Sequence, residues 1–242
     1  MSRAKEFYES YVFQASAGGS FRDDRLRKVI ARIPPDCKSL LDIGCGLGAN
    51  LVQFRQVVPA ARLCGIDIAE AGASQVRSLG FEATACDASA AIPYADATFE
   101  VVVCGEVLEH VADTDNLLRE IHRVLTPNGR LILTTPNLAY GVNRLLLLLG
   151  IQPFFTETSS STVLGRGTKA LGQGNSTQGH LKVFTGPSVR DILRQMSFQI
   201  VSFKGYSWLA DGFSGRIDRV LSTIPDVAAG FVVDARPLGK SF

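Results

Sequence analysis

Short apolar runs alternate with helically spaced apolar positions along most of this chain. The run 40–43 predicts a buried strand, and the apolar positions from Leu47 to Val58 recur every third or fourth residue, as on one face of a helix. The same pattern predicts strands at 40–43, 62–67, 81–86, 99–104, 130–135, 198–206 and 227–235. It predicts helices at 26–33, 47–58, 69–79, 114–125, 187–196 and 213–223. This alternation favours an α/β fold, a doubly wound and mostly parallel sheet with helices on both faces.

The alternation is interrupted between Pro136 and Thr185. An apolar helical piece at 142–149 is followed by a stretch rich in Gly, Ser, Thr and Gln at 156–180. A loop of this length inside a compact domain is usually functional or disordered. We expect residues 137–185 to form an insertion or lid over an acceptor site, with a merely flexible excursion as the alternative. The leucines at 145–149 are expected to pack on the core or in the lid; resting on a membrane surface or gripping a lipid-like acceptor stays open.

Length and charge restrict the function classes. The chain has 242 residues, 46% of them hydrophobic, and a formal net charge of +2, which predicts one domain over 1–242 with an N-terminal cap segment at 1–35. The near-neutral charge argues against a long nucleic acid as partner, and no apolar run is long enough for a transmembrane segment, while peripheral membrane contact stays open. The five cysteines form no CxxC pair, and the first residues lack the apolar core of a signal peptide, so we expect a cytoplasmic protein, either monomer or homodimer.

Glycines and carboxylates follow the predicted strands at the places where a nucleotide would bind. Gly44, Gly46 and Gly48 come directly after the first strand, Asp67 ends the second, and Asp87 follows the third. Ligands of open parallel sheets bind outside the carboxyl ends of the strands, and an acid about 20 residues after the glycine turn can accept hydrogen bonds from ribose hydroxyls. Asp87 is placed to accept from an adenine amino group. The sequence therefore predicts a nucleoside cofactor at this edge.

Four stretches resemble motifs of the class I S-adenosylmethionine-dependent methyltransferases. They are Leu41 to Gly48 (LDIGCGLG), Gly65 to Ile68 (GIDI), Ile92 to Val102 (IPYADATFEVV) and Leu125 to Leu131 (LTPNGRL). The resemblance implies S-adenosylmethionine as cofactor and a Rossmann-like, seven-stranded sheet whose last strand is antiparallel. It implies cofactor contacts from Asp42, Gly44, Cys45, Gly46, Gly48, Asp67, Ile68, Asp87, Ala88 and Cys104.

The polar residues after the fourth strand are candidates for the chemistry. On a helical turn Glu106, Glu109 and His110 would share one face. With His180 they resemble the metal site of small-RNA terminal 2′-O-methyltransferases, and the same Glu-x-x-Glu-His occurs in ubiquinone-pathway O-methyltransferases. This resemblance implies Mg²⁺ or Mn²⁺ on Glu106, Glu109, His110 and His180. His110 and Glu106 are the candidate catalytic residues, His110 also as a general base, although His110 could simply hold a neighbouring loop; His122 is expected on a helix surface.

The resulting expectation is an S-adenosylmethionine-dependent O-methyltransferase for a small-molecule, lipid-linked or glycan-linked hydroxyl. The leucines at 145–149 and the long insertion motivate this acceptor class. The alternatives are an RNA 3′-end 2′-O-methyltransferase and a non-catalytic nucleotide-binding module, for example an NAD-binding regulatory protein.

Overall fold

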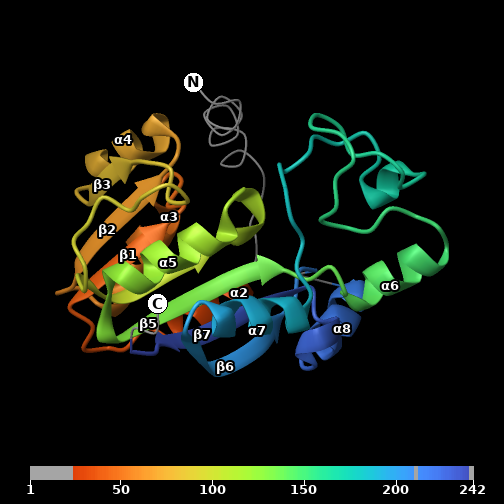
Figure 1. Cartoon of the computed structure of the whole chain (residues 1–242). Helices are drawn as coiled ribbons and strands as arrows, with labels where there is room; N and C mark the ends of the chain where they lie inside the picture. The colour runs from red at the N-terminus through yellow and green to blue at the C-terminus, as the bar shows by residue number, and fades with distance from the viewer. Residues whose placement is uncertain (1–23, 210–211, 240–242) are drawn as a thin grey trace.

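A twisted sheet of seven strands forms the centre of the computed structural model, which describes residues 24–209 and 212–239 (Figure 1). The strands are β1 (Ser39–Ile43), β2 (Arg62–Asp67), β3 (Glu82–Ala85), β4 (Phe99–Gly105), β5 (Leu125–Pro136), β6 (Phe198–Tyr206) and β7 (Gly230–Pro237). The helices are α2 (Asp24–Ile30), α3 (Ala49–Val57), α4 (Glu70–Ser78), α5 (Thr114–Val124), α6 (Gly141–Leu148), α7 (Gly186–Gln195) and α8 (Gly212–Leu221). Three short 3₁₀ turns are η1 (Leu108–His110), η2 (Lys169–Leu171) and η3 (Pro225–Val227).

The strand order is β3-β2-β1-β4-β5-β7-β6. The first five strands are parallel, and β7 runs antiparallel to both β5 and β6. This confirms the expected α/β fold with seven strands and an antiparallel last strand. Strand order reverses between β1 and β4, which leaves a crevice at their carboxyl ends.

Two apolar layers bury the two faces of the sheet. On one face α5 and α7 pack their apolar sides on β4, β5 and β7; on the other, α2, α3 and α4 pack on β1, β2 and β4. Figure 1 shows α5 and α7 in front of the sheet. Strands that are buried on both faces have continuous apolar sequences, which is why these strands could be predicted.

The predicted elements are all present, with shifts at two strands. β5 begins at Leu125 and not at 130. Leu125 already pairs with Phe99 of β4, and the register then shifts so that Arg130 pairs with Val101; the turn between Leu125 and Arg130 is therefore counted within the strand. β7 begins at Gly230, since the preceding residues form η3.

The expectation for His122 was wrong. This α5 side chain is buried, its Nε2–H donates to the carbonyl of Leu238 at 3.0 Å, and its ring packs edge-on against Phe198. The covering chain comes from the end of β7, which the periodicity of α5 alone does not reveal.

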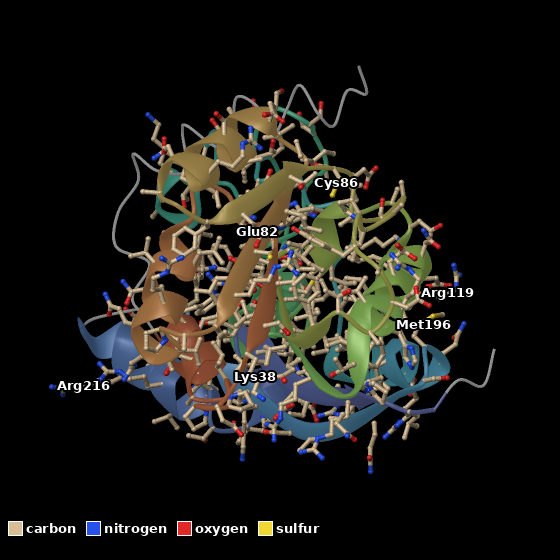
Figure 2. All side chains as sticks on the ribbon, turned by 90° about the vertical axis from the view of Figure 1, so that its left-hand side faces the viewer. Lys38, Glu82, Cys86, Arg119, Met196 and Arg216 are labelled. Carbon is tan, nitrogen blue, oxygen red and sulfur yellow. The ribbon has the colours of Figure 1, made fainter. Side chains whose placement is uncertain are left out.

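The two ends of the sheet differ in chemistry. Figure 2 shows Cys86 beyond the carboxyl end of β3 and Lys38 at the opposite end, before β1. The glycine turn after β1, Asp67, Asp87 and Glu106 all follow carboxyl ends of strands, so they gather at the Cys86 end. The N-terminal cap segment predicted at 1–35 lies outside the described residues up to position 23; from Asp24 it forms α2.

Candidate active site

The turn between β1 and α3 depends on its glycines. Gly44, Gly46 and Gly48 have φ of 72°, 50° and 87°, in the left-handed region that L side chains rarely adopt. A Cβ on Gly44 would also lie 2.4 Å from Cγ2 of Val107. The turn therefore needs glycine for its backbone angles and, at Gly44, for the close approach of the loop after β4.

Asp67 is fixed by two backbone groups. Its Oδ2 accepts from the N–H of Gly46 and its Oδ1 from the N–H of Ala69, both at 2.9 Å. A carboxylate oxygen can accept more than one hydrogen bond, so these oxygens can also accept from a ligand. Gly72 keeps this region open, since a Cβ there would come within 2.8 Å of the Gly46 carbonyl oxygen. A vicinal diol is a ligand that such a carboxylate can bind with both oxygens.

A cavity of about 470 Å³ opens at the carboxyl ends of β1, β2 and β4. This volume lies in the range of pockets for small molecules and cofactors. The predicted site residues in its wall are Gly44, Cys45, Gly46, Asp67, Ile68, Asp87, Ala88, Glu106 and His110. The wall also contains residues that sequence reasoning missed, among them Asn50, Ser89, Val111, Ala112 and Leu181. Their only sequence signal is proximity to a motif residue.

Three residues predicted to contact the cofactor do not line this cavity. Asp42 is buried within β1, Cys104 is fully buried within β4, and Gly48 caps α3. Burial raises the pKa of Asp42 to about 7, and Asp67 adds to the shift while Arg25 and Asn50 oppose it. Contact of these three residues with the cofactor stays a prediction.

The prediction that Glu106 shares a helical face with Glu109 and His110 was wrong. It precedes η1 and has a φ of 56°, a left-handed conformation that is uncommon for residues other than glycine. Its Oε1 accepts from the hydroxyl of Thr134 at 2.7 Å, and its Oε2 from the hydroxyl of Tyr206 at 3.1 Å. Burial beside this carboxylate raises the pKa of Tyr206 well above its usual value. Two hydroxyl donors from β5 and β6 thus hold Glu106 in the cavity wall.

The other three residues of the predicted metal set lie together. One ligand atom each from Glu109, His110 and His180 lie within 4.8 Å of one another. Glu109 is fully buried; its Oε2 accepts from the Thr135 hydroxyl at 3.0 Å, and its Oε1 has no hydrogen-bond partner among the described residues. Burial, and then the neighbouring Glu106, raise the pKa of Glu109 well above the usual range. A buried carboxylate oxygen without a donor is the kind of atom that a cation satisfies.

Both imidazoles bind a backbone carbonyl through the same nitrogen. Nδ1 of His110 lies 3.2 Å from the Gly179 carbonyl, and Nδ1 of His180 lies 2.7 Å from the Phe155 carbonyl. A carbonyl only accepts, so the Nδ1 of each ring carries a proton. Burial, and then the nearby His180, lower the pKa of His110 to about 4. His110 is therefore neutral at physiological pH, the form in which imidazole binds metals.

The loop before α7 completes the cluster. The carboxylate of Glu157 accepts from the backbone N–H of Gly179 at 2.8 Å and of His180 at 3.1 Å. Next in the chain, the N–H of Leu181 donates to the Glu109 carbonyl at 2.8 Å. The chain between β5 and α7 thus brings a histidine to η1 from 70 positions away and adds Leu181 to the cavity wall.

Comparison with known proteins identifies methyltransferases as relatives of this chain. A family model described as "Methyltransferase domain" matches residues 19–203. The ubiquinone/menaquinone biosynthesis C-methyltransferase of Desulfotalea psychrophila is 33% identical over 123 residues, covering 48% of this chain and 50% of that protein. The ubiquinone biosynthesis O-methyltransferase of Pseudomonas aeruginosa is 33% identical over 111 residues, covering 41% of this chain and 45% of that protein.

A longer match is to a Mycobacterium tuberculosis protein named "Probable S-adenosylmethionine-dependent methyltransferase", 30% identical over 177 residues, covering 69% of this chain and 60% of that protein. The chain thus spans about half the length of the curated relatives it matches. Among solved structures, a chain of the complex between the Haloferax volcanii Trm112 methyltransferase activator and a methyltransferase superposes with a TM-score of 0.71. The identity is 13%, covering 99% of this chain and 100% of that one, so this match supports the fold alone.

Proposed function

The chain belongs to the family of methyltransferase domains that use S-adenosylmethionine, and on that premise we propose that it methylates a hydroxyl oxygen of a small-molecule, lipid-linked or glycan-linked acceptor. The family and the cofactor expected from the glycine turn are thereby confirmed. The acceptor and the methylated atom are the proposal.

The donor half of the reaction is assigned to the cavity wall. Asp67 would accept from the two ribose hydroxyls, since both of its oxygens are oriented by backbone N–H groups. Asp87, whose Oδ1 accepts from the N–H and hydroxyl of Ser89, would face the adenine edge. S-adenosylmethionine supplies an electrophilic methyl on a sulfonium. In the transfer, the S–CH₃ bond breaks, an O–CH₃ bond forms, and the hydroxyl proton leaves to a base.

The observation that carries O-methylation is the carboxylate–imidazole cluster at the cavity. His110 belongs both to the cavity wall and to the cluster with Glu109 and His180. A hydroxyl must lose its proton to become a good nucleophile, and these groups can promote that loss.

We propose that Glu109, His110 and His180 hold a divalent cation, Mg²⁺ or Mn²⁺. The donor set fits: two imidazoles whose Nδ1 atoms are occupied by backbone carbonyls, and one buried carboxylate with a partnerless oxygen. Such a cation lowers the pKa of a coordinated hydroxyl. A pKa of about 4 makes His110 a weak proton acceptor at neutral pH, which favours it as a ligand over a general base. Glu106, held apart by its two hydroxyl donors, is then the carboxylate in the wall that can take the proton.

The segment 137–185 is proposed as the wall of the acceptor site. It contributes Leu181 to the cavity and His180 to the cluster. Its aromatic side chains Phe154 and Phe155 pack edge-on against Trp208 at 5.3 and 5.2 Å between ring centroids. These contacts support a built wall and argue against a merely flexible excursion.

A methyl-transfer screen with isotope-labelled S-adenosylmethionine tests the proposal. The acceptors are a phenol, the same phenol carrying a prenyl chain, and a sugar with a free hydroxyl. Two RNA oligonucleotides complete the panel, one with a 2′-hydroxyl and one with a 2′-deoxy 3′ end. Aromatic amines and O-blocked phenols report N- and C-methylation. Methylation of the hydroxyl acceptors alone supports the proposal, and transfer to the amine or to ring carbon refutes it.

The same screen separates the alternatives. Transfer only to the RNA with a 2′-hydroxyl end identifies the RNA-end enzyme. Calorimetry that detects NAD but not S-adenosylhomocysteine identifies a non-catalytic nucleotide-binding module. Activity that is lost in EDTA and restored by Mg²⁺ or Mn²⁺ supports the cation, whereas full activity in EDTA excludes it.

A further inference from the structure

Helix α6 and its C-cap expose a group of leucines to solvent. Leu145, Leu147, Leu148 and Leu149 are 65%, 57%, 85% and 73% exposed. Residues 145, 148 and 149 are spaced i, i+3, i+4 and so lie on one face of the helix. Scattered exposed leucines are common, but a contiguous apolar group of this kind marks an interaction site.

The exposure is built into the fold, because α6 is anchored on its other side. Asn143 is fully buried; its side-chain amide donates to the carbonyls of Leu138 and Phe154, and its Oδ1 accepts from the Phe154 N–H at 2.8 Å. Leu146, one turn further, is 7% exposed. The helix cannot rotate its exposed leucines inward without breaking these bonds.

Helix α8 lies beside α6 and exposes further apolar side chains. Figure 1 shows α6 and α8 together at one end of the molecule, and a Cβ on Gly141 of α6 would lie 3.2 Å from Leu221 of α8. On α8, Ile217 is 46% and Val220 is 68% exposed. We define the α6–α8 surface as the exposed side chains of Leu145, Leu147, Leu148, Leu149, Ile217 and Val220.

Arginines lie on these two helices, and the acids near them in the described part of the chain are buried or paired. Helix α8 carries Arg216 and Arg219 on its exposed side, and its one acid, Asp218, is 1% exposed and accepts from the Tyr140 hydroxyl at 2.8 Å. Helix α6 contains Arg144 and no acid. Asp226, whose backbone carbonyl accepts from Arg144, pairs its carboxylate with Arg190 at 3.0 Å.

The insertion that follows α6 has the same bias. Residues 150–185 contain one arginine and two lysines but a single acid, Glu157. The Glu157 carboxylate accepts from three consecutive backbone N–H groups, at 178–180, so it faces the protein. Arg166 is buried, so the exposed cations of this stretch are Lys169 and Lys182.

We infer that the α6–α8 surface docks on an anionic lipid bilayer. Exposed leucines on a short helix with cations beside them are the composition that binds at the interface of a membrane with acidic headgroups. A second copy of this chain fits less well, because a two-fold contact would bring these cations together. No helix among residues 24–209 and 212–239 is long and apolar enough to cross a bilayer, so the contact is peripheral. The inference does not depend on which acceptor is methylated.

Vesicle co-sedimentation of the full chain tests this inference. The probes are vesicles of phosphatidylcholine alone and of phosphatidylcholine with one third phosphatidylglycerol. We expect binding to the anionic vesicles, weakened by salt, and at least tenfold weaker binding to the neutral ones. The double substitution Leu148→Glu, Leu149→Glu should reduce anionic-vesicle binding tenfold or more.

The matched control is Leu79→Glu, a half-exposed leucine at the end of α4, at the opposite end of the molecule in Figure 1. It adds a negative charge and should keep wild-type binding. Circular dichroism and calorimetry with S-adenosylhomocysteine check that the variants fold, since the substituted leucines do not line the cavity. Equal binding to both kinds of vesicle, or equal loss in the control, overturns the inference. So does a wild-type dimer that becomes monomeric in the double variant without any vesicle binding.

Discussion

Replacing Asp42 by Asn should make the folding stability of this protein less dependent on pH. The Asp42 side chain is 1% exposed in the middle of β1, and its Oδ2 has no hydrogen-bond partner among the described residues. Burial raises its pKa from 3.8 to about 7. The folded protein therefore resists ionisation of this carboxyl, while the unfolded chain does not.

The sign of the effect follows from linkage between protonation and folding. Below about pH 4 the carboxyl is protonated in both states and its ionisation costs nothing. Between about pH 4 and about pH 7 only the unfolded state loses the proton, so stability falls by about 1.4 kcal/mol per pH unit. Above about pH 7 both states are ionised and the loss is constant. From about pH 5 to about pH 8, Asp42 should thus cost about 3 kcal/mol of stability.

Urea denaturation of the wild type and Asp42→Asn at about pH 5 and about pH 8, without cofactor, measures this cost. The difference in unfolding free energy between variant and wild type is compared at the two pH values. This comparison cancels any pH-independent effect of the amide on packing or on its contact with Asn50. The stability of the Asn variant relative to wild type should rise by about 3 kcal/mol. Asp96→Asn, at an exposed carboxylate, should show no comparable rise. A relative stability of Asp42→Asn that is the same at both pH values would refute the reasoning.

Three further predictions concern the cavity and the cluster. Asp67→Ala removes both oxygens proposed to bind the ribose and should weaken S-adenosylhomocysteine binding roughly 100-fold or more by calorimetry, while Asp96→Ala leaves it unchanged; a loss under fivefold contradicts the assignment. Gly44→Ala should destabilise the fold by about 1–3 kcal/mol in urea, because φ is 72° and the new Cβ would meet Val107. Adding Val107→Ala should recover part of that loss, and no recovery would rule out the contact. His180→Ala should weaken Mn²⁺ binding at least tenfold by electron paramagnetic resonance, and wild-type Mn²⁺ affinity in this variant would remove His180 from the proposed metal site.

The local half of the structure follows from the order of residues along the chain. Continuous apolar runs specify strands buried on both faces, and a 3.6-residue spacing specifies the helices that cover them. The position of Asp67 at the end of β2 follows from the same pattern, since the run 62–67 ends there. Its contact with the glycine turn could be anticipated as well, because parallel neighbouring strands end at the same edge.

The acceptor half could be predicted only in part. The residues Glu109, His110 and His180 were identified, but Glu106 was assigned to the wrong backbone conformation. Its left-handed φ is maintained by donors from Thr134 and Tyr206, which lie 28 and 100 positions away in the chain. Local periodicity carries no information about such partners.

The sequence by itself determined the strands, the helices, the glycine turn and the family of this protein, because these depend on short-range spacing and backbone preferences. Only the tertiary structure decided that the Asp42 carboxyl is buried, that His180 reaches His110, and that the leucines of α6 face solvent. These outcomes depend on which distant segments pack together: the same leucine run is compatible with a buried or an exposed helix. Here the buried Asn143 anchors one side of α6 and leaves the other to water.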